Sequence, residues 1–450
     1  MSSANRLART RSLAFNGRPF STSTSLRLKP SFNPTDPNHK FWWNLTQPSL
    51  KALFKHSTPS YTPNDINSHL SWFQYTAIPH LGPKPSPKTP LSSMLNWDGS
   101  PYRPQWNFCN NTSTVRLGFD ATVSPHDVTL SDFAATSNDS NQDMTWANRL
   151  VASLSPDLQE KTPYINGGAA GNNPPQHFLA WSYKPGGKRE FKPYFFPWRK
   201  SYSTGKTDSG VIYDAAEDIA CLSGSENILR LNMIGIDCIS FDKAPRLKVY
   251  ALAQTNAFKF MRDVMTLGGR IEEKGEVGRG IECLRGVYDL IMGGEKIDEG
   301  KSKQLVHHHE VGVLKMSIVS WEMKVGREVP EVKIYVPLWH FAETEGEVVE
   351  NVREIFKRVG WGEQAEMYGE ALREVFPYVD FNKRAGIHGW MSFSYDDKKG
   401  PYATVYYVPR AKKANNLQEG IEVVDGIGKE VKFDFHPAAE GGRGYKYFAG

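Results

Sequence analysis

Short stretches in which polar and aliphatic residues alternate recur along the chain. At 331–336 the sequence reads EVKIYV, so Lys333 and Tyr335 would share one face of a strand and three aliphatic residues the other, because strand side chains point alternately to two faces. The aliphatic face is expected to be buried. On a single strand the polar face would ordinarily lie in water, as in many antiparallel sheets.

Related patterns occur on other segments. FKPYFFP at 191–197, PRLKVYALA at 245–253 and GPYATVYYVP at 400–409 alternate in the same way, and TVRLGFD at 114–120 carries an arginine in a comparable setting. Taken at Arg116, Lys192, Arg246, Lys333 and Tyr402, successive copies lie 76, 54, 87 and 69 residues apart. This recurrence indicates an internal repeat whose polar face has a common use.

Helical patterns separate these strands. Apolar residues at 257–269 recur at helical spacing before a glycine pair, and 347–377 predicts two helices that are interrupted near 360–362. The expected strand pairs are 314–323 with 332–338, and 390–395 with 403–409. The order of elements is therefore helix, helix, strand, strand, repeated.

Antiparallel hairpins separated by helix pairs can form a flat sheet covered on one side or a closed barrel surrounded by helices. The recurrent cations and tyrosines favour the barrel, because helices that cover the aliphatic face leave the polar face directed into a lumen. We therefore predict an α+β fold with ααββ repeats, in which α-helices surround an antiparallel β-barrel with a polar lumen. Residues 36–450 are expected to form a single domain. In the strand at 191–197, Pro193 removes a backbone donor and predicts a bulge.

Composition narrows the class of protein. The chain has 450 residues, of which 39% are hydrophobic and 12% aromatic, as expected of a globular protein. It contains no run of about 18 apolar residues, so membrane insertion is not expected. Its cysteines, at positions 109, 221, 238 and 283, show no CxxC spacing. This pattern predicts neither a zinc cluster nor a disulfide framework, and fits a reducing compartment.

Residues 1–35 differ from the rest of the chain. They are rich in arginine and serine and contain no acidic residue, which is typical of a mitochondrial transit peptide. RPFSTS resembles a processing site with cleavage after Phe20, and a disordered basic tail on a cytoplasmic protein is the alternative. Cleavage would lower the formal charge from +5 to +1. A nearly neutral body argues against a nucleic-acid partner.

The predicted lumen combines two kinds of side chain. Buried cations require an anion to neutralise them, and a cluster of this size suits a diphosphate. Tyrosine rings attract cations through their faces. Together they describe a site that ionises an allylic diphosphate: the cations hold the leaving diphosphate, and the tyrosines shield the carbocation from water. The cations are Arg116, Lys192, Arg246, Lys248 and Lys333, and the tyrosines are Tyr194, Tyr250, Tyr335, Tyr402 and Tyr406.

On these motifs the sequence resembles the fungal aromatic prenyltransferases of the dimethylallyltryptophan synthase (DMATS) type, of the ABBA or PT-barrel superfamily. The resemblance extends from about residue 40 to the end, and RLKVY, KPYFFP, KIYVP and GPYATVYYVP are its most specific segments. It implies a ten-stranded antiparallel barrel surrounded by helices, and it assigns the five cations to diphosphate binding and the five tyrosines to the shield. Lys333 departs from the pattern, since some members carry glutamine there.

The resemblance also implies the reaction. A dimethylallyl or longer prenyl group would pass from an allylic diphosphate to a small aromatic acceptor in a Friedel–Crafts-type alkylation of secondary metabolism. No cofactor is implied and Mg²⁺ is not required. Metal-dependent prenyl synthases use DDxxD clusters, whereas Asp396 and Asp397 precede two lysines in an expected turn. Whether the protein forms a homodimer is left open.

One departure bears on the acceptor. Members that prenylate indoles generally carry a glutamate shortly before the first arginine, where it accepts the indole N–H, but 100–115 contains no acidic residue. Arg103 or Gln105 occupies that neighbourhood, and neither is a general base. We therefore expect a phenolic or polyketide-derived acceptor. The alternatives are an indole or tryptophan prenyltransferase in which Asp98 or another acid supplies the base, and a non-catalytic barrel that binds an anionic aromatic metabolite.

Overall fold

The computed structural model describes most of the chain between residues 32 and 411. The described residues are 32–59, 61–89, 91, 93, 95–121, 129–139, 141–154, 177–197, 200, 229–253, 255–306 and 317–411. Residues 1–31 of the expected transit segment at 1–35 lie outside them, as does the far C-terminal part of the predicted domain. Within the described residues, no helix is both long enough and apolar enough to cross a membrane.

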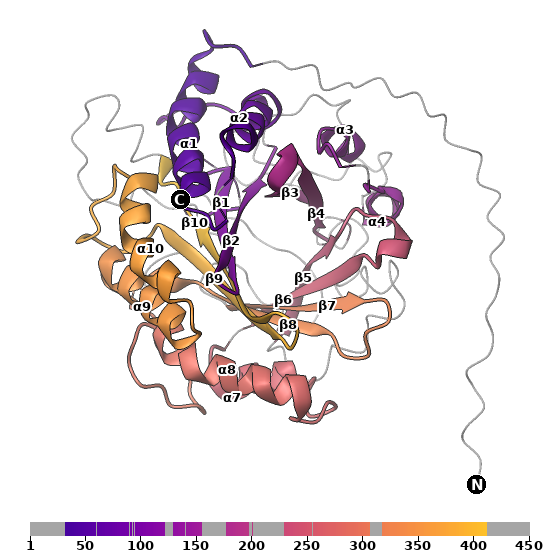
Figure 1. Cartoon of the computed structure of the whole chain (residues 1–450), viewed down its shortest axis with the longest axis vertical. Coiled ribbons are helices and arrows are strands. Elements are labelled where there is room, and N and C mark those ends of the chain that lie inside the picture. Colours follow the sequence, from indigo (N-terminus) through magenta and orange to yellow (C-terminus); the bar gives the residue numbers. More distant parts are fainter. Residues whose placement is uncertain are drawn as a thin grey trace, which may run out of the picture.

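Ten antiparallel strands close into a barrel, in the order β1-β10-β9-β8-β7-β6-β5-β4-β3-β2. Figure 1 shows the barrel end-on, with helices packed around its outside. This arrangement confirms the predicted α+β fold and the closed alternative. The strands are β1 (Tyr102–Cys109), β2 (Thr112–Phe119), β3 (His177–Tyr183), β4 (Arg189–Phe195), β5 (Leu229–Ile236), β6 (Arg246–Ala253), β7 (Ser317–Lys324), β8 (Glu331–Val336), β9 (His388–Asp396) and β10 (Gly400–Tyr407).

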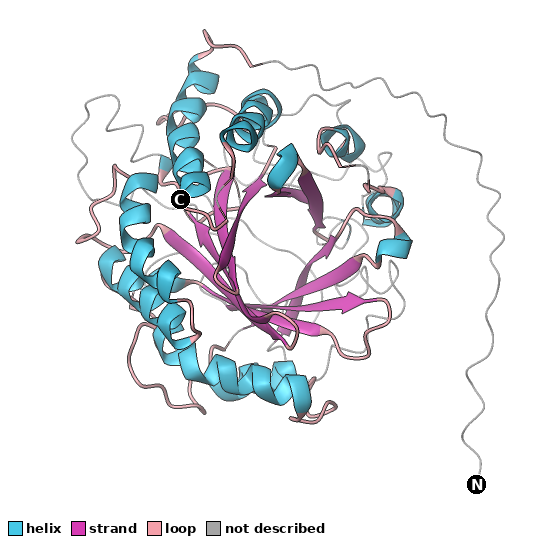
Figure 2. Ribbon diagram, viewed as in Figure 1, coloured by secondary structure: helices cyan, strands magenta, loops and turns pink. Residues whose placement is uncertain are grey.

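Helices cover the outer face of the barrel, as the secondary-structure colouring of Figure 2 makes clear. They are α1 (Pro37–Lys55), α2 (Pro63–Trp72), α3 (Leu130–Ala135), α4 (Thr145–Leu154), α7 (Phe258–Met265), α8 (Gly275–Ile291), α9 (Glu345–Arg358) and α10 (Gly362–Val375). The interruption predicted near 360–362 is confirmed, because α9 ends at Arg358 and Gly360 adopts a φ of +83°, a conformation that glycine adopts readily. At its other end Thr344 caps α9 by accepting from the Glu347 N–H.

The hydrophobic core lies between the barrel wall and the helices. The outward positions of the strands supply side chains such as Trp106, Val249 and Ile334, and the helices supply side chains such as Leu53 and Ile355, all of them buried. Burial of a large aliphatic or aromatic side chain contributes roughly 1.5–3 kcal/mol. Because this layer buries the aliphatic strand faces, the polar faces are directed into the lumen.

The predicted bulge at Pro193 is wrong. The pairing of β3 with β4 runs without a register shift from His177↔Phe195 to Tyr183↔Arg189, and Pro193 lies opposite Leu179. The proline is accommodated differently, because β4 pairs with β5 only at the two residues that follow it, Tyr194 and Phe195. Before Tyr194 the two strands are not paired, so a missing backbone donor costs little there.

Candidate active site

Every second strand of the barrel runs in the same direction, because neighbouring strands are antiparallel. On β4, β6 and β8 a lysine precedes a tyrosine by two residues, in Lys192–Tyr194, Lys248–Tyr250 and Lys333–Tyr335. Two residues advance a strand by about 7 Å without changing face. The repeated motif therefore builds two layers in the lumen, one of cations and one of tyrosines.

The cation layer brings together all five cations that the sequence indicated. Burial lowers the pKa of Lys192, and the nearby charges of Arg116 and Lys248 lower it further. Arg246 and Lys333 both bond to the same carboxylate, Glu322, which places them side by side. Arg116 donates through Nη2 to the Tyr402 hydroxyl, and its Cζ lies 5.7 Å from the centre of that ring. Lys333 Nζ lies 4.9 Å from the same ring centre. Tyr402 is therefore part of this layer.

Carboxylates that the sequence analysis did not single out neutralise much of this charge. Asp237 accepts from Arg246 Nε at 2.6 Å and from Lys248 Nζ at 2.9 Å. Glu322 accepts from Arg246 Nη1 at 3.0 Å and from Lys333. Their cationic neighbours hold the pKa of both carboxyls well below the usual range, against the opposing effect of burial.

The remaining members of the layer differ in their partners. Lys192 donates to Glu190 at 3.1 Å and to the Ser182 hydroxyl at 3.0 Å. Among the described residues Arg116 has no carboxylate partner, and its buried Nε has no hydrogen-bond acceptor. An incoming diphosphate would thus meet the Arg116 guanidinium, which has no carboxylate partner among the described residues. It would also meet four cations that already contact carboxylates, and it would have to share or replace those contacts.

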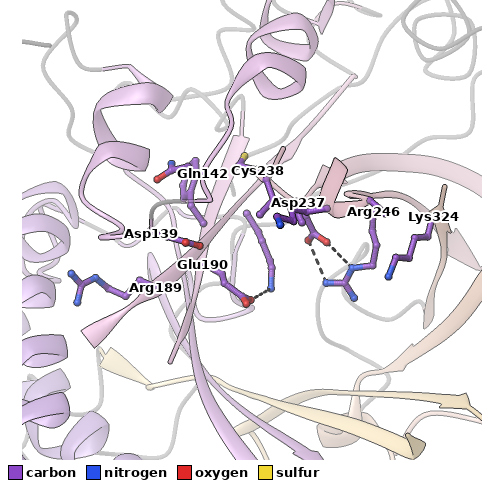
Figure 3. Close-up of a pocket in the computed structure, with 13 residues that line it drawn as sticks. Asp139, Gln142, Arg189, Glu190, Asp237, Cys238, Arg246 and Lys324 are labelled. Atoms are coloured by element: carbon purple, nitrogen blue, oxygen red, sulfur yellow. Dashed lines mark hydrogen bonds and ion pairs between the residues drawn. The ribbon is translucent and has the colours of Figure 1, made fainter. Parts of the chain in front are cut away.

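A pocket of about 200 Å³ opens at this layer. It is lined by residues of β4, β6 and β7, of the 237–244 connection and of the segment around 139–142, and Glu190, Lys192, Asp237 and Arg246 are among them. Figure 3 shows Asp237 paired with Arg246 at the pocket. The pocket lies where β4 and β5 are not paired, so it borders two of the cations, Lys192 and Arg246.

Four tyrosines form the second layer. The centres of successive rings lie 5.8 Å apart for Tyr194–Tyr250, 5.8 Å for Tyr250–Tyr335 and 5.9 Å for Tyr335–Tyr406. The four residues come from β4, β6, β8 and β10, which are not neighbours in the sheet. Their rings nevertheless contact one another in an arc around the lumen, which suits the stabilisation of a cation by ring faces.

Small residues on the intervening strands allow these contacts. Gly235 on β5 lies opposite Tyr194, and Ser392 on β9 lies opposite Tyr335. Ser320 on β7 lies opposite Tyr250. A Cβ at position 235 would lie 2.9 Å from two ring carbons of Tyr194, so only glycine leaves room for that ring. These positions were not found from sequence, because they carry no charged or aromatic signal.

Two acids near this part of the barrel, Asp98 and Asp120, have different surroundings. Asp98 accepts from the backbone N–H and hydroxyl of Ser100, at 2.9 and 2.6 Å, and from the Ala411 N–H at 3.2 Å. It therefore fixes a turn. Asp120 is buried and accepts from the Ser93 hydroxyl at 2.8 Å; burial raises its pKa to about 7, and no cation or tyrosine contributes to that shift.

Arg103 lies where the expected glutamate is absent. It is half-buried, faces the lumen from β1, and lies opposite Gly118 on β2. Gln105, two residues on, is buried on the same face, and a Cβ at position 118 would lie 3.0 Å from its Nε2. The side chains that this part of β1 directs inward are thus a guanidinium and an amide.

The described part of the chain offers no metal centre. No group of three or more His, Cys, Asp or Glu side chains is placed there to hold a metal ion. Asp396 is bonded to Arg327 at 3.0 Å and Asp397 to Arg279. The pair is engaged by arginines at a turn.

The family model for tryptophan dimethylallyltransferase matches residues 38–371. The chain belongs to this family. It is accordingly a prenyltransferase with the PT-barrel fold, and the resemblance stated from its motifs is confirmed.

Three relatives show how similar this family member is to proteins with assigned activities. An indole diterpene prenyltransferase of Tolypocladium album is 28% identical, over 84% of this chain and 95% of the relative. An O-glucose prenyltransferase of Phomopsis amygdali is 27% identical, over 85% and 92%. A 7-dimethylallyltryptophan synthase of Aspergillus fumigatus is 26% identical, over 82% and 84%.

Solved structures share the fold. AnaPT from Neosartorya fischeri superimposes with a TM-score of 0.71 at 19% identity, over 84% of this chain and 96% of that one. NotF, solved in complex with brevianamide F and DMSPP, gives a TM-score of 0.67 at 21% identity, over 85% and 98%. These likenesses extend the family assignment to the barrel architecture.

Proposed function

We propose that this aromatic prenyltransferase transfers a dimethylallyl group from dimethylallyl diphosphate to a carbon or hydroxyl of a phenolic or polyketide-derived aromatic. The five cations hold the diphosphate as it departs, and the tyrosines stabilise the allylic cation and exclude water from it. Both assignments are supported by the two layers. The departing diphosphate needs positive charges around it, whereas the allylic cation needs electron-rich ring faces. On each strand the lysine and the tyrosine that supply these surroundings are two residues apart. The relatives that bind thiolated analogues of the same donor support its identity.

The phenolic acceptor is supported by one observation, the absence of an acidic residue from residues 100–115, where Arg103 and Gln105 face the lumen. An indole loses a proton from a neutral ring and profits from a carboxylate near its N–H. The lumen carboxylates Glu190, Asp237 and Glu322 are engaged by cations. A phenol is activated by its own hydroxyl and requires such a carboxylate less.

A second candidate acceptor is an indole. Relatives named for indole diterpenes and for tryptophan support it, although another relative is named for a glucose. The family therefore covers several acceptor classes. In this second proposal the proton would pass to an acid such as Asp120, whose raised pKa suits proton transfer near neutrality.

The test is product formation by the full chain with dimethylallyl diphosphate, followed by mass spectrometry. The acceptor panel contains phenols, hydroxynaphthalenes, simple indoles and tryptophan, and geranyl and farnesyl diphosphate are run in parallel to establish donor length. We expect a gain of one dimethylallyl mass on hydroxyarenes and little on indoles. Turnover of indoles alone, lost in Asp120→Asn, would replace the first proposal by the second.

A further inference from the structure

Arg103 takes the place of a tyrosine in the second layer. The cation–tyrosine pairs of β4, β6 and β8 have a counterpart on β2, where Arg116 is followed two residues later by Gly118. The space left by that glycine is bordered from β1 by two side chains, since a Cβ at 118 would lie 3.0 Å from the Gln105 Nε2 and 3.9 Å from the Arg103 Nε. Four tyrosines, the Gln105 amide and the Arg103 guanidinium therefore surround the lumen at this level.

This guanidinium has few partners. Its Nη1 donates to the Leu95 carbonyl at 2.9 Å, and its Cζ lies 5.3 Å from the centre of the Tyr406 ring. The Nε is buried without an acceptor, and no carboxylate contacts the side chain among the described residues. An arginine has five N–H donors, so most of them remain available. Burial lowers the pKa of Arg103 and the surrounding tyrosines raise it, yet an arginine stays charged in proteins.

Apolar side chains lie beside it. The side chain of Leu95, whose carbonyl accepts from Arg103, packs with Phe178 and Phe196 in a buried cluster, and Tyr194 and Met233 lie against this cluster. Sites for small aromatic molecules are usually lined by apolar side chains with a few fixed polar groups. The guanidinium and the neighbouring apolar side chains supply these two kinds of group.

The charge of Arg103 opposes the reaction unless something neutralises it. A site that generates a carbocation next to a ring of tyrosines gains nothing from an uncompensated positive charge in the same ring. The donor's diphosphate is held one layer away, on Arg116 and the lysines, so it does not serve this purpose. The remaining molecule that can supply an anion is the acceptor.

We propose that Arg103 binds the ionised hydroxyl of a hydroxyarene, so that the acceptor reacts as its phenolate. This inference rests on the proposed function, which it makes more specific. Guanidinium and phenolate neutralise each other, and the neighbouring apolar side chains contact the ring. The negative charge makes the ring carbons ortho and para to the oxygen nucleophilic, which removes the need for a carboxylate before the bond forms.

The hydroxyl proton of the acceptor passes to solvent when the phenolate binds to Arg103, and the reaction then proceeds without a protein base. The C1–O bond of the donor breaks and its electron pair leaves with the diphosphate. A ring carbon of the phenolate forms the new C–C bond to C1, which gives a neutral dienone. The tetrahedral ring carbon loses its proton to a diphosphate oxygen, and the phenolate is restored on Arg103. Attack by the phenolate oxygen itself would give an ether with no proton to remove.

The test uses a chromophore whose ionisation is visible. The full chain is loaded with inorganic diphosphate to fill the cation layer, and bound 4-nitrophenol is titrated by absorbance to obtain its pKa on the protein. We expect this pKa to fall by at least one unit relative to free 4-nitrophenol, and Arg103→Leu to abolish the shift and weaken phenolate binding at least tenfold. Arg103→Lys should retain most of the shift, because it keeps the charge.

The matched control is Arg410→Leu. Arg410 also lies over an aromatic ring, with its Cζ 5.9 Å from the centre of Trp97, but outside the tyrosine layer, so its loss should leave the bound pKa unchanged. An unshifted pKa in the wild type, or an equal shift in Arg103→Leu, overturns the proposal. So does Arg103-dependent binding of 4-nitrobenzoate with no shift for 4-nitrophenol, which would indicate a carboxylate acceptor.

Turnover is measured separately, so the two proposals fail separately. A shifted pKa that depends on Arg103, combined with no prenylation of any phenol, would support the phenolate site and reject the phenolic acceptor. Prenylation of phenols that is equally fast in Arg103→Leu, with an unchanged pH profile, would support the acceptor class and reject the role of Arg103.

Discussion

The lowered pKa of Lys192 predicts that binding of the donor depends on pH. Burial lowers its pKa to about 7, an effect that Arg116 and Lys248 reinforce and that Asp237 and Glu190 oppose. The charged form, which binds the anionic diphosphate, therefore prevails below pH 7 and is lost above it. With a pKa of about 7, roughly nine-tenths of the lysine is charged at pH 6 and roughly one-tenth at pH 8. We expect kcat/KM for the donor to fall about tenfold between these values, because this parameter reports ionisation of the free enzyme.

The bound state should behave differently. A diphosphate beside Lys192 raises the pKa of the lysine, so kcat at saturating donor should stay nearly constant over the same range. The assay is initial-rate kinetics with a fixed saturating acceptor whose hydroxyl does not titrate between pH 6 and 8. Lys192→Arg is the control, since a guanidinium remains charged and should remove the decline in kcat/KM. A flat wild-type profile, or the same decline in Lys192→Arg, would refute the reasoning.

Three further predictions concern the ring, the metal and the N-terminus. In Gly235→Ala the new Cβ would lie 2.9 Å from the Tyr194 ring, so kcat should fall at least tenfold while KM for the donor changes little; a larger effect on KM than on kcat would contradict the layered site. Excess EDTA should leave most of the activity, whereas complete loss that Mg²⁺ restores would reject the metal-independent mechanism. If residues 1–20 are a transit peptide, protein from native mitochondria should begin near Ser21, and an intact N-terminus on cytoplasmic protein would reject that proposal.

The barrel could be predicted from the sequence because the pattern that specifies each strand lies within a few consecutive residues. A lysine two residues before a tyrosine, with aliphatic residues between and around them, fixes which face of each strand is wet. Alternate strands of the barrel run in the same direction. The lysines of Lys192–Tyr194 and Lys333–Tyr335 therefore lie at one level of the lumen, and the tyrosines lie together at the next level. The number of strands came from the family resemblance alone.

The counter-ions could not be predicted in the same way. Arg246 is bonded to Glu322 across the β6–β7 pair, 76 residues away, and nothing in either segment specifies this register. Glu190 lies two residues before Lys192 on the same face of β4. The sequence thus indicated this ion pair, but we did not predict it. Gly235 and Ser320 were missed because their contribution is the space they leave to tyrosines on other strands.

Electrostatics links the missing glutamate to the identity of the acceptor. A second positive charge ~6 Å from a carbocation costs roughly 3 kcal/mol at an effective dielectric constant of about 20, which is about a hundredfold in rate. Cation–π contributions of roughly 0.5–2 kcal/mol per ring, or roughly 2–8 kcal/mol for the four tyrosines, would be offset in part or in full by this repulsion. If Arg103 paired only with the Leu95 carbonyl, the arginine would thus impede the step that the tyrosines promote. A phenolate on Arg103 removes the penalty in the same encounter that delivers the nucleophile, so ionisation of the donor would be favoured only when a reactive acceptor is already in place.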